Sequence, residues 1–131
     1  MNMDFKTYKF WDVIKELDWE NACKGKYERP YITTHDRLKK LTNNDSMFQS
    51  YIETTARAYR NVLVEKLREY SLQKYGNRYT FPMVSDDSLW DLTAHIVGCG
   101  EHTYNRIMKH PEKISDYLDK YVENFEYTFN D

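Results

Sequence analysis

Apolar residues recur every three or four positions over most of the chain, which is the spacing of one face of an α-helix. The longest such segment begins at Asp45 or Ser46 and ends at Gly76, a residue type that favours the turn after a helix. Its expected buried stripe consists of Phe48, Tyr51, Ile52, Thr55, Tyr59, Val62, Leu63 and Tyr70. A helix of this length would span about 45 Å. Because that exceeds what a small domain needs, we expect the helix to bend, to break or to project toward a partner.

The same spacing predicts shorter helices on both sides of this segment, over residues 5–23, 34–41, 85–110 and 111–122. Thr33 or Thr34 is the expected cap of the second of these helices. Ser85, which two aspartates follow, is the expected start of the third, because acidic residues favour the positive end of the helix dipole. Pro111 either ends the third helix or opens the fourth.

Two stretches instead alternate large apolar residues with other types, the period of a β-strand. They carry Tyr79, Phe81 and Met83 in one case and Phe125, Tyr127 and Phe129 in the other. Pairing residues 78–83 with 124–129 as a two-stranded ribbon would satisfy both backbones, with Pro82 on an outer edge. The alternative is a free tail that adds as a strand to the sheet of a partner.

Composition narrows the function classes. The chain has 131 residues, enough for one domain and too few for two independent cores. Its 19 basic and 21 acidic residues give a net charge of −2, so no overall attraction draws it to nucleic acid or to an anionic membrane. Cys23 and Cys99 lack CxxC spacing, and the opening residues contain no apolar run of the signal-peptide type, so we expect reduced thiols in the cytoplasm.

The run WDLTAHIVGCGEHTYNRIMKH concentrates metal-binding residue types on one predicted helix. His95 and Cys99 are four residues apart and Cys99 and His102 three apart, so either pair could share an ion. The two histidines would lie about 10.5 Å apart along the axis and could not easily bind one ion together. We therefore expect no metal and no cofactor here, and instead a close helix contact at Gly98 and Gly100, with Cys99 buried against it.

The stretch WDLTAHI resembles the ligand helix of DinB-like metal-binding helical bundles. The resemblance covers this one helix and matches one ligand, His95. It implies a metal-dependent bundle enzyme in which His95 is a ligand, and the helical spacing offers Cys99 and His102 as further ligands. A second histidine helix of the kind such proteins use is not found in the chain.

Arginines and aromatic residues provide candidate contacts for a macromolecule. Arg57, Arg60 and Arg68 lie opposite the expected apolar stripe of the long helix, and Tyr70 lies along its edge. Such a face could hold phosphates and stack bases, although glutamates are interleaved with the arginines. Tyrosine and arginine are also enriched in protein interfaces, and the aromatic chain end with Phe125, Tyr127 and Phe129 offers a further recognition segment.

These observations predict a mainly α-helical single domain over residues 1–131, a bundle of four to five helices with the small ribbon as a candidate addition. No catalytic motif is found, so we interpret the chain as a cytoplasmic, non-enzymatic protein that binds another macromolecule, with a protein as the first choice. A regulator or inhibitor from a phage or mobile element would fit, and the long helix could join two copies of the chain. Nucleic-acid binding and DinB-like metal chemistry are the alternatives, and no membrane contact is expected.

Overall fold

The computed structural model describes residues 10–25 and 29–130. Within these ranges the chain forms six α-helices and two 3₁₀ helices, and no strand. They are α1 (Phe10–Leu17), α2 (Trp19–Cys23), α3 (Pro30–Leu41), α4 (Ser46–Tyr75), α5 (Asp86–Gly98), α6 (Glu101–Lys109), η1 (Pro111–Tyr117) and η2 (Phe125–Phe129). The mainly helical class is thus confirmed, while the count of α-helices is six instead of four to five.

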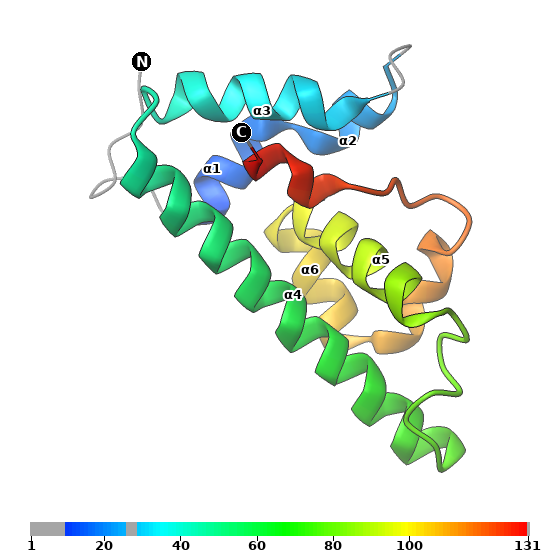
Figure 1. Ribbon diagram of the computed structural model, residues 1–131. Coiled ribbons are helices and arrows are strands. Elements are labelled where there is room, and N and C mark those ends of the chain that lie inside the picture. The colour runs from blue at the N-terminus through cyan, green and yellow to red at the C-terminus, as the bar shows by residue number, and fades with distance from the viewer. Residues whose placement is uncertain (1–9, 26–28, 131) are drawn as a thin grey trace.

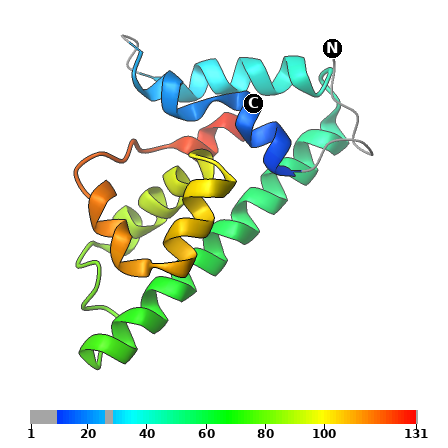
Figure 2. The same ribbon diagram turned by 180° about the vertical axis from the view of Figure 1, so that it is seen from behind.

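The arrangement follows the long helix α4 (Figure 1). The first half of α4 lies beside α1, and α1 and α2 pack against α3. Further along, α5 packs on α4. The helix α6 packs on α5 and on η1, and it lies in front of α5 in the reverse view of Figure 2. The last turns of α4 extend past α5 and α6, with only the loop of residues 76–85 beside them. No described helix combines the length and the apolar composition needed to cross a membrane.

Local signals fix both ends of α4, as the sequence predicts. Asp45 caps the first turn, because its carboxylate accepts a hydrogen bond of 2.9 Å from the backbone N–H of Phe48. Gly76 follows the last turn with a positive φ of 74°, a left-handed conformation that glycine adopts without steric cost. The helix runs unbroken between these residues.

The buried stripe of α4 differs from the prediction. Tyr51 and Val62 are 38% and 51% exposed, although the spacing placed them in the core. The observed stripe consists of Phe48, Ile52, Ala56, Arg60, Leu63, Val64, Leu67 and Ser71. A large ring with a polar tip is satisfied at the boundary of a core, so several tyrosines that the pattern placed inside lie at the edge.

Two helices that the spacing predicts as continuous, over residues 5–23 and 85–110, are each divided in two in the structure. Asp18 takes a left-handed conformation between α1 and α2, with φ of 54°, and Gly100 takes an extended conformation with a positive φ of 108° between α5 and α6. The predicted start of the first helix at Phe5 lies outside the described residues. Ser85 caps α5 as predicted, accepting a hydrogen bond from the N–H of Ser88.

The second predicted helix begins earlier than its expected threonine cap. Pro30 is the first residue of α3, a position where its missing N–H costs nothing. Thr34 is consequently inside the helix, fully buried, with its hydroxyl 2.6 Å from that of Thr128.

The predicted ribbon does not form in the structure. Residues 78–83 make turns and bends, and the C-terminal stretch folds as the 3₁₀ helix η2 along α3. In η2 the side chains of Phe125 and Thr128, three residues apart, share the buried side. Phe125 packs edge-on against Trp19 at 5.0 Å between ring centroids, so the chain end is part of the core and is not a free tail.

Candidate functional site

His95 is buried and held by the backbone and side chains around it. Its Nδ1 accepts hydrogen bonds from the indole N–H of Trp19, at 2.9 Å, and from the backbone N–H of Val122, at 3.2 Å. Because Nδ1 accepts twice, the proton of the neutral ring is on Nε2, which lies 3.4 Å from the sulfur of Cys99. Burial lowers the pKa of His95 to about 4.

The neighbouring thiols are also held in their neutral form. Burial raises the pKa of Cys99 far above its usual range, and it raises the pKa of Cys23 to about 12. A thiol that stays protonated is a poor nucleophile and a poor metal ligand at neutral pH.

The third member of the predicted metal set is separated from the other two. His102 is exposed on α6, beyond the break at Gly100. Within the described ranges, no three His, Cys, Asp or Glu side chains are placed to hold a metal ion together. His95 and Cys99 thus meet as the spacing predicts, but as neutral partners of a packed helix end.

Only one of the two glycines makes the close contact that the sequence predicts. A β-carbon at Gly98 would lie 2.8 Å from ring atoms of both Phe125 and Trp19. A β-carbon at Gly100 would meet nothing within 4 Å, and this residue is needed for its positive φ. The partner at Gly98 is also not a regular helix of a bundle but η2 and the start of α2.

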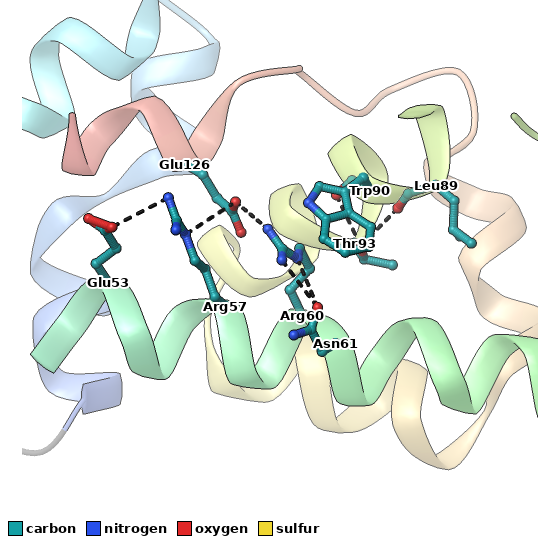
Figure 3. Close-up of polar contacts among 8 residues, drawn as sticks. All are labelled: Glu53, Arg57, Arg60, Asn61, Leu89, Trp90, Thr93 and Glu126. Atoms are coloured by element: carbon teal, nitrogen blue, oxygen red, sulfur yellow. Dashed lines mark hydrogen bonds and ion pairs between the residues drawn. The ribbon is translucent and has the colours of Figure 1, made fainter. Parts of the chain in front are cut away.

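Arg60 corrects the prediction of an exposed arginine face. It is 5% exposed in the middle of the buried stripe of α4, and its guanidinium binds the carboxylate of Glu126 on η2 (Figure 3). The guanidinium carbon also lies 3.9 Å from the ring centroid of Trp90 on α5. Burial lowers the pKa of Arg60, while Glu126 acts in the opposite direction.

The other two predicted arginines are paired as well. Arg57 lies 3.3 Å from Glu53 and 3.9 Å from Glu126. Arg68 lies 3.7 Å from Glu65 and 3.5 Å from Asp86. Carboxylates therefore balance the arginines on this part of α4, which is unfavourable for binding phosphates.

The aromatic residues predicted for interaction are mostly part of the fold. Phe125 is buried, and Phe129 is partly buried against the core. Tyr70 is partly buried, with its ring 5.0 Å from that of Phe81. Tyr127 is the exception, because 48% of it is exposed.

The end of α4 and the loop after it carry a group of exposed apolar side chains, which we name the tip surface. It consists of Leu72, Tyr75, Tyr79 and Met83, which are 46%, 49%, 70% and 82% exposed. The sequence predicts Tyr79 and Met83 on the face of a strand, while Leu72 and Tyr75 lie near the end of the long helix that it predicts up to Gly76. The turn residues Gly76 and Pro82 around them were the available signal for a surface loop.

The loop that carries the tip surface is held firmly against α4. The hydroxyl of Ser71 bonds the carbonyl of Asn77 and accepts a hydrogen bond of 2.9 Å from the N–H of Phe81. Arg78 forms an ion pair of 2.8 Å with Glu65. The tip surface is therefore an ordered feature, with its large side chains outside.

A separate cavity lies between α5 and η2, and we name it the acidic cavity. It measures about 510 Å³, and its walls include the rings of Trp90 and Tyr127. Its charged wall residues are Asp86, Asp87, Asp91 and Glu126, all of them acidic. The sequence reading missed this site, because its residues come from two segments that carry no shared motif.

Comparison with known protein families identifies the family of this chain. A family described as "Protein of unknown function (DUF4240)" matches residues 5–131. No curated protein and no solved structure matches the chain.

Proposed function

We propose that this chain, which belongs to the DUF4240 family, functions by binding another protein through the tip surface. The observation that carries the proposal is the exposure of four large apolar side chains on the last turn of α4 and the loop after it. Large exposed apolar side chains that gather at one end of a small protein commonly mark an interaction site, because leaving them in water is unfavourable.

The backbone of Met83 adds support. Its φ is 65°, a left-handed conformation that costs a non-glycine residue about 1 to 2 kcal/mol. With 82% of the residue exposed, burial of its side chain returns nothing within the chain itself. Strain that the fold does not offset is typical of positions that serve an interaction.

The rest of the proposal concerns mode of action. We infer a non-enzymatic, regulatory or inhibitory protein of the cytoplasm, and the neutral state of His95, Cys99 and Cys23 supports the absence of nucleophilic chemistry. The ion pairs of Arg57, Arg60 and Arg68 favour a protein over a nucleic acid as the partner.

Site-specific photo-crosslinking in the native host tests the proposal. A photoreactive residue is placed at position 83 in one variant and at position 47 in the other. Met47 is the matched control, because it is also a methionine, is 78% exposed and lies at the opposite end of α4. We expect a defined product of higher mass from position 83 and none from position 47.

The nature of the product decides between partners. A crosslinked product that contains a different protein supports the proposal. A product that contains two copies of this chain would contradict it and would make the tip surface a dimer interface instead. Crosslinks to nucleic acid, equal products from both positions, or no product from position 83 would contradict it.

A further inference from the structure

The acidic cavity has a chemistry of its own, separate from the tip surface. We propose that it binds an organic cation, a guanidinium or ammonium group, against the ring of Trp90. The volume of about 510 Å³ is within the range of small-ligand sites. Its walls combine carboxylates with aromatic rings, the two groups that proteins use to hold such cations.

The protein already shows that this ring accepts a guanidinium. Arg60 stacks on Trp90 with 3.9 Å between its guanidinium carbon and the ring centroid. A planar cation held at this distance gains from the negative face of the indole. Trp90 remains 45% exposed and Tyr127 48% exposed, so both wall residues keep surface for a second cation.

The charges of the wall are only partly balanced by the protein. Asp86 is paired with Arg68, and one oxygen of Glu126 is paired with Arg60. No arginine, lysine or histidine of the described residues lies within ion-pair distance of Asp87 or Asp91. The wall therefore carries an excess of negative charge that an incoming cation would offset.

Two further details point in the same direction. Burial raises the pKa of Asp91, and the nearby carboxylates of Glu123 and Asp87 raise it further. Glu126 Oε2 is buried and has no hydrogen-bond partner among the described residues, although its twin oxygen is held by Arg60. A ligand that donates hydrogen bonds, as guanidinium and ammonium groups do, would suit Asp91 directly, and Glu126 Oε2 once a small side-chain movement uncovers that oxygen.

The walls favour an organic cation over a metal ion. Divalent ions need several oxygen ligands converging on one point, and the described residues contain no such group of His, Cys, Asp or Glu. Aromatic rings contribute little to a metal site, but they bind the flat or rounded surface of an organic cation.

Titration followed by NMR at the indole N–H of Trp90 tests the proposal. The probes are acetyl-arginine-amide, acetyl-lysine-amide and acetyl-citrulline-amide, the last being a neutral analogue with nearly the shape of arginine. We expect a saturable shift of the Trp90 signal with arginine or lysine amide, and none with citrulline amide. Equal shifts with citrulline amide, or no saturable shift with either cation, would overturn the proposal.

Charge-neutral variants locate the binding. Asp87→Asn combined with Asp91→Asn should weaken binding by about fivefold or more, since it removes two unpaired carboxylates. Glu16→Gln combined with Glu101→Gln is the control, because it removes the same charge from two exposed residues outside the cavity. A similar loss in both pairs would mean non-specific attraction to an acidic protein and would also overturn the proposal.

A third arm identifies the source of the cation. The peptide Gly-Ser-Arg-Ser-Gly is compared with acetyl-arginine-amide on the unchanged protein. Binding of the peptide that is at least about tenfold tighter assigns the site to a basic segment of a protein chain, and equal binding assigns it to a free small cation. Because the probes do not require the tip surface, loss of this proposal would leave the proposed function standing, and the reverse also holds.

Discussion

The buried histidine makes the stability of the fold depend on pH in a way that one substitution can isolate. His95 is 5% exposed, and burial lowers its pKa from the ordinary 6.5 to about 4. The folded ring therefore stays neutral in a range where the ring of the unfolded chain takes up a proton. As the pH falls below 6.5, the unfolded state binds more protons than the folded state, so stability decreases.

The size of this effect follows from the two pKa values. At about 1.4 kcal/mol per pH unit, the interval between 6.5 and about 4 corresponds to about 3 to 4 kcal/mol. This contribution is complete above pH 6.5 and lost by about pH 4. Asp91 and Glu126 act with the opposite sign, because burial raises their pKa values and folding then favours the protonated carboxyls.

His95→Gln separates the histidine from these carboxyls. At pH 7.5 we expect the variant to be about 1 to 3 kcal/mol less stable than the wild type, because the buried indole N–H of Trp19 and the partly buried backbone N–H of Val122 lose their acceptor. Between pH 7.5 and 4.5 the difference should shrink by about 2 to 3 kcal/mol, since only the wild type loses the histidine contribution.

Chemical denaturation at a series of pH values measures the difference. His102→Gln is the matched control, because it removes an exposed histidine of the same sequence run, and its profile should stay parallel to that of the wild type. Parallel profiles for His95→Gln and the wild type would refute the reasoning.

Three other perturbations test how the core is assembled. Arg60→Met should lower the free energy of unfolding by about 3 to 5 kcal/mol, because it leaves a buried carboxylate without its partner. Arg57 is half-exposed, so Arg57→Met should change this free energy by less than about 1 kcal/mol. Equal effects of the two variants in chemical denaturation would contradict this. Gly98→Ala should lower the free energy of unfolding by about 1 to 3 kcal/mol, because the new methyl group overfills the contact with the rings of Trp19 and Phe125. Replacing Phe125 by a smaller residue should then restore part of the stability. No such rescue is expected for Gly100→Ala, because there the positive φ of the backbone is unfavourable for alanine. Deletion of residues 124–131 should lower the melting temperature by roughly 10 °C or more, and an unchanged melting temperature would mean that η2 is not part of the core.

Signals that act within one turn of a helix could be read from the sequence. The sequence correctly predicts the start of α5 at Ser85 and the end of α4 at Gly76, and it narrows the start of α4 to Asp45 or Ser46, because a cap is decided by residues three or four positions apart. The metal-like spacing of His95 and Cys99 was also local, and the two side chains do meet.

Features that depend on distant partners could not be read. Arg60 is of a residue type expected at an exposed helix position. Its buried charge is balanced by Glu126, which lies 66 residues away in the chain, and is covered by the ring of Trp90. The same limit applies to the acidic cavity, whose two aromatic walls come from α5 and η2.

Short segments also allow two periods at once. Over the five residues of η2, the alternation of Phe125, Tyr127 and Phe129 fits a strand, while Phe125 and Thr128 fit a 3₁₀ helix. Contact with Trp19 and Thr34 selects the second period. In the long helix, a pattern of many tyrosines was compatible with more than one buried face, and packing selected the face that contains Arg60.

The dissociation constant of the crosslinked partner tests the central claim most directly. It is measured with purified proteins for the wild type, for Tyr79→Ser combined with Met83→Asn, and for the control Met47→Asn; asparagine tolerates the positive φ at position 83. We expect at least about tenfold weaker binding for the tip variant, equivalent to about 1.4 kcal/mol, with unchanged affinity for the control and unchanged melting temperatures. An unchanged dissociation constant for the folded tip variant would contradict the claim that the protein acts through the tip surface.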